Sequence, residues 1–120
     1  MSEPWSSDQP IYKQLRDRVA GLIMDGTFVE GEAIPSVRQV SAEEQINHLT
    51  VGKAYQELVD EGVLEMKRGR GMFVMTDARD KLKQQEREKF AATELPALLS
   101  RVKQLGLSVE QLIELIQASE

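Results

Sequence analysis

Cysteine is absent from this chain of 120 residues, and histidine occurs only once, at position 48. Without cysteine there can be no disulfide framework, thiolate metal site or thiol nucleophile, and the composition is compatible with a reducing cytosol. A single histidine without any cysteine also argues against a transition-metal site. We therefore expect no metal, no other cofactor and a cytoplasmic location.

Long hydrophobic runs are absent as well. No segment approaches the roughly 20 apolar residues that a membrane-spanning helix requires. The first ten residues, MSEPWSSDQP, lack the basic and apolar regions of a signal peptide, so we expect no contact with a membrane. With only one Trp, two Tyr and three Phe, the core must be mainly aliphatic.

Positive charge is in the minority, with 15 Lys and Arg against 20 Asp and Glu and a net charge of −5. An acidic chain is a poor candidate for indiscriminate binding to polyanions, so any contact with nucleic acid must come from a local patch. The stretch Glu65–Val74, EMKRGRGMFV, contains such a patch in Lys67, Arg68 and Arg70. Alone it is a weak signal, because a solvated turn can carry the same charges.

Three helices are predicted in the first half of the chain, at residues 10–25, 37–44 and 48–61. Pro10 suits the start of the first helix, and Asp8 is its candidate cap. Ser36 and Gln39 form a Ser-x-x-Gln capping box for the second helix. Asn47 is expected to cap the third.

After Gly62 the hydrophobic period changes from 3.6 residues to about 2. The runs VLEMK and MFVM are prone to form strands, and the glycines of RGRG supply a turn, so we predict a β-hairpin. Helix, short helix, helix and hairpin in this order are typical of a winged helix-turn-helix. A small α+β domain without a special role would show the same order.

The last 45 or so residues are predicted to be helical. A charged helix from Asp77 to Phe90 precedes an apolar-striped helix in which Pro96 should cause a kink or a break. Ser108 and Gln111 form a further capping box that opens the last helix. The apolar positions of these helices are Leu95, Leu98, Leu99, Val102, Leu105, Leu112, Ile113 and Ile116.

So short a segment cannot enclose a core of its own, because its surface is too large for its volume. The apolar faces must therefore pack on the N-terminal domain or on a second copy of the chain. We divide the chain into a winged helix-turn-helix at residues 1–76 and a helical dimerisation tail at residues 77–120.

A helix-turn-helix places the N-terminal part of its second helix in the major groove of DNA. Here that part contains Asn47, His48, Thr50, Gly52 and Lys53. Polar side chains and unpaired N–H groups at a helix start can meet base edges and phosphates, and glycine permits a close approach. A basic hairpin tip beside this helix can lie along the phosphate backbone or enter the minor groove.

Four segments together resemble the DNA-binding domain of the GntR family of bacterial transcription regulators. They are PIYKQL (10–15), EGEAIPSVRQVS (30–41), NHLTVGKAYQELVDEG (47–62) and RGRGMFV (68–74). The length of the chain, the asparagine at position 47 and the helical tail ending in LGLSVEQLIELI resemble the YtrA-type subfamily. The resemblance implies a mainly helical α+β fold, an N-terminal winged helix-turn-helix and a short α-helical dimerisation region.

The resemblance also implies roles for individual residues. Arg38 in the PSVR element, which begins with Pro35 and Ser36, would contact DNA. The other expected DNA-binding residues are Asn47, His48, Thr50 and Lys53 on the recognition helix and Arg68, Gly69 and Arg70 in the wing. Ile34 replaces the usual leucine of the family, a change that conserves volume. His48 and Leu49 also depart from the family pattern, and Leu49 can offer a base only an apolar contact with a thymine methyl.

We expect a transcription regulator, with repression as its mode, that binds an inverted-repeat operator in double-stranded DNA as a homodimer. An enzyme is not expected, because no paired carboxylates, catalytic triad or phosphate-binding loop stands out. One alternative is a winged-helix module that binds a partner protein and never DNA. Another is a sensor whose small-molecule effector, which the sequence does not identify, binds between the tail and the winged helix.

Overall fold

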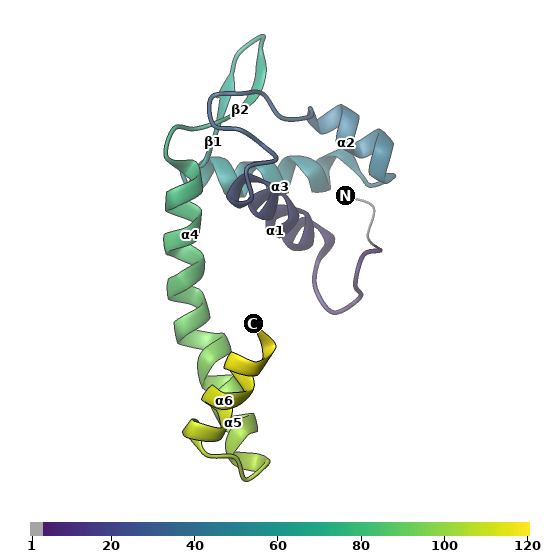
Figure 1. Ribbon diagram of the computed structural model, residues 1–120. Coiled ribbons are helices and arrows are strands. Elements are labelled where there is room, and N and C mark those ends of the chain that lie inside the picture. Colours follow the sequence, from purple (N-terminus) through teal and green to yellow (C-terminus); the bar gives the residue numbers. More distant parts are fainter. Residues whose placement is uncertain (1–3) are drawn as a thin grey trace. The chain divides into compact units, whose positions relative to one another are not determined.

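The computed structural model describes residues 4–120 (Figure 1). The chain divides into two compact units, with the boundary between Lys83 and Gln84. The fold is mainly helical α+β with one two-stranded antiparallel sheet, which confirms the expected fold class. Within the described residues, no helix is both long enough and apolar enough to cross a membrane.

The first unit contains three helices, a hairpin and the beginning of a fourth helix. Their bounds are α1 Ile11–Met24, α2 Val37–Glu44, α3 His48–Asp60, β1 Leu64–Lys67, β2 Gly71–Val74 and α4 Ala78–Lys89. The three predicted helices are all present, and their ends differ from the predicted ends by one residue at most. The hydrophobic period therefore located these elements correctly.

The start of α1 differs from the prediction, because its N-cap is Pro10 and no side chain caps it. Asp8 instead accepts a hydrogen bond from the Ser6 hydroxyl. Gln14 holds the preceding segment: its Nε2 donates to the carbonyls of Ser6 and Gln9, each at 2.8 Å. Gln14 therefore ties the preceding segment to α1, but no side chain takes the capping role that was expected of Asp8.

The caps of α2 and α3 follow the prediction more closely. The Ser36 hydroxyl accepts from the Gln39 backbone N–H at 3.0 Å, and Asn47 Oδ1 accepts from the Leu49 N–H at 2.8 Å. The capping box at Ser36 is only half formed, because the Gln39 side chain donates to Glu43 and does not reach back. An exposed glutamine has competing partners one turn further along its helix, and here that contact prevails.

The hairpin pairs β1 with β2 in an antiparallel register that runs from Leu64 opposite Val74 to Lys67 opposite Gly71. Its turn is closed by a hydrogen bond of 2.8 Å from the Arg70 N–H to the Lys67 carbonyl. Gly69 has a φ of 75° in this turn, a value that residues with a side chain adopt only at a cost. The expected wing is therefore formed.

An aliphatic core joins the three helices to the hairpin. Its buried residues come from all three helices and the strands and include Leu15, Val19, Val40, Val51, Leu58 and Leu64. Tyr55 is also buried, and its hydroxyl donates to the Pro35 carbonyl at 2.7 Å. Burial raises the pKa of this phenol, so Tyr55 acts as a neutral hydrogen-bond donor that fixes the loop before α2.

The first turns of α4 belong to the same core, since Ala78 and Leu82 are fully buried. The carboxylate of Glu30 accepts from the backbone N–H groups of Asp77 at 2.9 Å and Arg79 at 3.3 Å. Arg79 Nε in turn donates to the Met24 carbonyl at 2.6 Å. A loop residue 47 positions earlier in the chain therefore caps α4.

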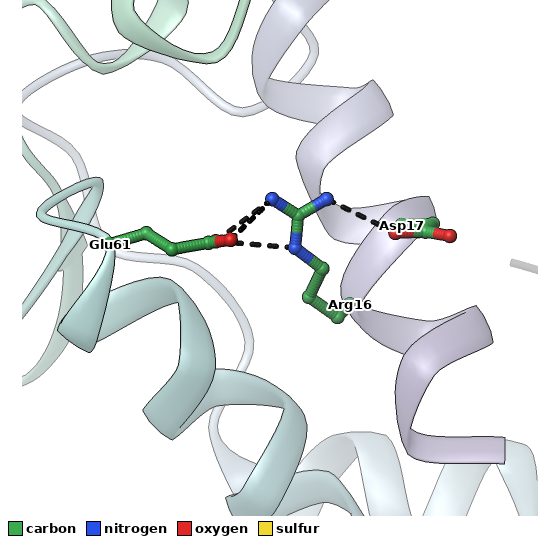
Figure 2. Close-up of polar contacts among 3 residues, drawn as sticks. All are labelled: Arg16, Asp17 and Glu61. Atoms are coloured by element: carbon green, nitrogen blue, oxygen red, sulfur yellow. Dashed lines mark hydrogen bonds and ion pairs between the residues drawn. The ribbon is translucent and has the colours of Figure 1, made fainter. Parts of the chain in front are cut away.

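One ion pair links α1 to the end of α3 (Figure 2). Arg16 is only 7% exposed, and its Nη2 lies 2.8 Å from each carboxylate oxygen of Glu61. Its Nε donates to the same carboxylate at 3.2 Å, and its Nη1 reaches Asp17 at 3.1 Å. The fork geometry fixes the pair more tightly than a single contact would.

The second unit consists of the remainder of α4, a π-helical turn at Phe90–Glu94, α5 at Leu95–Gln104 and α6 at Val109–Ser119. No coil separates α4 from α5, so the break expected at Pro96 is absent. A π-helical turn joins the two helices, and Pro96 is the second residue of α5. In that turn the Leu95 N–H donates to the Phe90 carbonyl, five residues back, as is typical of a π-bulge. The capping box of Ser108 and Gln111 is complete and opens α6.

Breaking the Arg16–Glu61 pair should weaken the fold. We expect Glu61→Gln to lower the free energy of unfolding by about 1–3 kcal/mol, because the buried Arg16 guanidinium loses its charged partner. The free energy is measured by urea unfolding. Asp60→Asn is the matched control, since it removes a neighbouring exposed charge and keeps an acceptor for Gln56. Equal stability of the two variants would contradict this role for the pair.

Candidate nucleic-acid interface

A hollow lies where α2 meets the start of α3, and it is lined by Val37, Arg38, Ser41 and His48. Arg38 and His48 are exposed, so their polar atoms face solvent. The Ser41 hydroxyl donates to the Ile46 carbonyl at 2.6 Å, which ties the end of α2 to the turn before α3. The structure thus brings together two predicted site residues, Arg38 and His48, that are ten positions apart in sequence.

The start of α3 presents further predicted site residues. Asn47 caps the helix through its side-chain oxygen, which leaves the two N–H donors of its amide for a ligand. The Ser36 hydroxyl can likewise donate to a ligand, because its oxygen accepts from the Gln39 N–H when it caps α2. Thr50 is half-buried, whereas Leu49 is 71% exposed, so an apolar side chain lies at the surface of this region.

Gly52 follows on the same helix, and a Cβ added to it would meet no atom within 4 Å. The missing side chain therefore leaves open space on the outside of α3. A bulky ligand can approach the helix backbone more closely here than at any residue with a longer side chain.

Lys53 is exposed, but its ammonium does not extend freely into solvent. Its Nζ lies 3.9 Å from the centroid of the Tyr12 ring on α1. This distance is well within the roughly 6 Å range of a cation–π interaction. The sequence reasoning identified Lys53 and missed Tyr12, because the two residues are 41 positions apart and no local pattern connects them.

The hairpin carries the second group of cations. Lys67 Nζ and the Arg70 guanidinium lie 4.5 and 5.2 Å from the centroid of Phe73. Arg68 and Gly69 are exposed at the tip of the turn. Alternation along β2 is the signal that could have linked Phe73 to the wing, because Phe73 and Gly71 face the same side of the strand.

Acidic residues gather at the other end of α3. Asp60 accepts a hydrogen bond from Gln56, and Glu61 is held by Arg16. Lys53, in the first half of α3, is therefore separated along the helix from the acids at its end.

The residues expected to mediate dimerisation differ in exposure. Leu95, Leu98, Leu105, Ile113 and Ile116 are exposed, and Leu99 and Leu112 are half-buried. Val102 is only 5% exposed in the single chain, so it has little surface left to offer a partner. Three further side chains outside the expected dimerisation set, Phe90, Val109 and Leu115, are exposed on the same unit.

The model of the family described as "Bacterial regulatory proteins, gntR family" matches residues 11–74. The uncharacterized HTH-type transcriptional regulator YhcF of Bacillus subtilis is 29% identical over 116 residues, which cover 95% of this chain and 93% of YhcF. The HTH-type transcriptional repressor YtrA of the same organism is 38% identical over 76 residues. That match covers 63% of this chain and 58% of YtrA.

Solved structures agree with these relatives. A GntR family transcriptional regulator from Listeria monocytogenes superposes with a TM-score of 0.80 at 28% identity, covering 97% of this chain and all of that one. YtrA from Sulfolobus acidocaldarius, a GntR-family transcription factor, has a TM-score of 0.59 at 28% identity over 99% of this chain and 95% of its own. The DNA-binding domain of AraR, solved with operator ORX1, has a TM-score of 0.54 at 27% identity, covering 62% and 90%.

These matches confirm the resemblance inferred from the sequence, including the likeness to YtrA. The matched residues 11–74 run from the start of α1 to the end of the wing, so they contain the hollow, the start of α3 and the basic hairpin. The chain therefore belongs to the gntR family of bacterial regulatory proteins and is a GntR-type transcription regulator with a DNA-binding winged helix-turn-helix domain.

Proposed function

We propose that the protein represses transcription by binding an inverted-repeat operator as a homodimer in the bacterial cytoplasm. The observation that carries this proposal is the set of exposed cations on a GntR-type domain: Arg38 on α2, Lys53 on α3, and Arg68 and Arg70 on the wing. Several relatives are named as repressors, among them YtrA of Bacillus subtilis and MngR of Escherichia coli. The related AraR domain is seen in complex with its operator.

The start of α3 is suited to the major groove. The positive end of the α3 dipole favours a phosphate oxygen, although Asn47 already accepts from the N–H groups of Leu49, Thr50 and Val51. Asn47 and His48 offer polar groups that can meet base edges, and Leu49 offers an apolar contact to a thymine methyl. Gly52 lets the helix backbone come close to the groove, because no atom occupies the space where its side chain would be.

Arg38, Lys53 and the wing cations are suited to the phosphate backbone. They carry positive charge on an otherwise acidic protein of net charge −5, so attraction to DNA must be local and orientation-dependent. The acids at the far end of α3 disfavour any pose that brings that end to the phosphates. Charge distribution thus selects one orientation of the helix on the duplex.

The tail supports the dimer. Eight of the twelve large hydrophobic side chains that are exposed in the described residues lie between Phe90 and Ile116. So much apolar surface in one short segment is typical of an interaction site. A second copy of the same tail can cover it by two-fold symmetry, and two-fold symmetry of the protein requires inverted half-sites in the operator.

Linking two winged helices should also raise the affinity of the protein for its operator. A single module buries little surface on DNA. When two modules are joined, binding of the second half-site becomes an intramolecular event and affinity rises without new contacts. The proposed dimer therefore follows from the energetics of DNA binding as well as from the exposed tail.

Arg38→Ala should weaken operator binding by about 1–3 kcal/mol, because the lost guanidinium reaches a phosphate or a groove edge from the hollow beside α3. Affinity is measured by fluorescence anisotropy on a duplex that the wild-type protein selects from random sequences. Lys103→Ala is the control, since it removes one exposed positive charge from α5. Wild-type affinity in a folded Arg38→Ala variant would show that this residue does not contact DNA.

Replacing Arg68 and Arg70 together by Ala should lower affinity for many sequences alike, since these residues are proposed to contact the backbone. The slope of log affinity against log salt should become shallower by roughly 1–2, because fewer counterions are released. Lys89→Ala with Lys103→Ala removes the same charge from exposed positions outside the winged helix. If the two double variants have the same slope, the wing lies off the DNA.

Ile113→Glu combined with Ile116→Glu should convert the dimer to a monomer, because two carboxylates would be buried in the proposed interface. Sedimentation velocity at micromolar concentration measures the change, and Gln117→Glu adds charge to the same helix as the control. A chain shortened to test the tail should end after Lys83, since Ala78 and Leu82 belong to the core. A wild-type protein that sediments as a monomer contradicts the proposed assembly.

A further inference from the structure

The contact between Lys53 and Tyr12 has a role that family membership does not assign. Tyr12 is half-buried on α1 and packs against the hydrophobic core. Its ring is therefore held in place by the fold, whereas Lys53 is exposed and its ammonium lies over the ring. The 3.9 Å separation between the Nζ atom and the ring centroid couples a mobile charge to a fixed surface.

This coupling matters because lysine is a costly side chain to order. Its four-carbon stem loses much rotational freedom when the ammonium is fixed on a phosphate. A ring that already holds the ammonium near its working position removes part of that loss before DNA arrives. The ring covers one side of the ammonium, so the N–H donors on the open side remain able to reach a phosphate oxygen.

The wing shows the same arrangement with a different ring. Phe73 is half-buried on β2, pairs with Glu65 across the hairpin and forms a bridge with Ala33 on its other side. Its backbone is therefore held from two directions. Lys67 and Arg70 both lie over its ring, at 4.5 and 5.2 Å, so the wing cations also rest on an anchored aromatic surface.

We propose that Tyr12 and Phe73 are positioning residues for DNA binding, which hold Lys53 and the wing cations in place for the phosphate backbone. The inference rests on the proposed function, because it assigns a task to residues that need not touch DNA themselves. It differs from a purely structural role in one respect: the effect of each ring should depend on the cation that lies over it.

A double-mutant cycle on the full-length chain tests the Tyr12 contact. Tyr12→Leu should weaken binding to the selected duplex by about three- to tenfold, while Tyr12→Phe, which keeps the ring, should stay within about twofold of wild type. In a Lys53→Met background, Tyr12→Leu should have no further effect, because no ammonium remains to be positioned. Circular dichroism and urea unfolding verify that each variant is folded.

The wing supplies a second and independent cycle. Phe73→Leu should weaken binding in the wild-type background and lose most of that effect once Lys67→Met and Arg70→Gln are present. These two substitutions remove the charges and keep side chains of similar length. If either leucine variant cannot be purified as a folded protein, the other cycle still decides the proposal.

Four results would overturn the inference. Equal losses from Tyr12→Leu with and without Lys53 would show a structural role for the ring. A loss from Tyr12→Phe as large as that from Tyr12→Leu would assign the effect to the hydroxyl. Unchanged affinity in Lys53→Met would remove the lysine from the interface while leaving the proposed function intact, whereas a wild-type chain that selects no duplex would overturn the proposed function and this inference with it.

Discussion

The packing of α1 against α3 is the constraint on which the rest of the first unit depends. Leu15 and Val19 on α1 and Val51 and Leu58 on α3 are fully buried in one cluster, and each contributes about 1.5–3 kcal/mol by leaving water. Polar contacts between the same two helices also fix their relative orientation. Arg16 forms an ion pair with Glu61 at the end of α3, and the Tyr12 ring contacts the Lys53 ammonium nearer its start. The recognition helix is therefore oriented by α1 along its length.

An acidic chain that binds DNA must keep its positive charges apart from its negative ones. In this structure the two kinds of charge lie on different short segments. Cations lie in the first half of α3 and on the turn of the hairpin, while Asp60 and Glu61 lie at the far end of α3. Arg16 also neutralises Glu61 through their ion pair, which weakens the negative field of this carboxylate. A net charge of −5 is thus compatible with a local positive surface, and it disfavours binding in other orientations.

The second unit solves a different problem, because it is too small to bury its own apolar residues. Its helices are nevertheless well specified by local signals: a complete capping box opens α6, and a turn through Gly106 ends α5, with the Leu107 N–H donating to the Val102 carbonyl at 3.1 Å. Local signals thus form the helices and leave their apolar faces exposed. These faces need a packing partner to leave water, and in our proposal that partner is a second copy of the chain.

The sequence by itself determined the order and limits of the helices, the hairpin and the caps at Ser36, Asn47 and Ser108. These features rest on contacts within about four residues, and such contacts can be read from spacing alone. Where a side chain had a choice of partners, at Asp8 and Gln39, the local reading was wrong or incomplete. Tertiary structure alone decided that Tyr12 supports Lys53, that Arg16 binds Glu61 and that Val102 is buried, because each depends on how distant segments pack. The spacing of residues within one helix or strand carries no information about contacts between side chains that are far apart in sequence and meet only when the core forms.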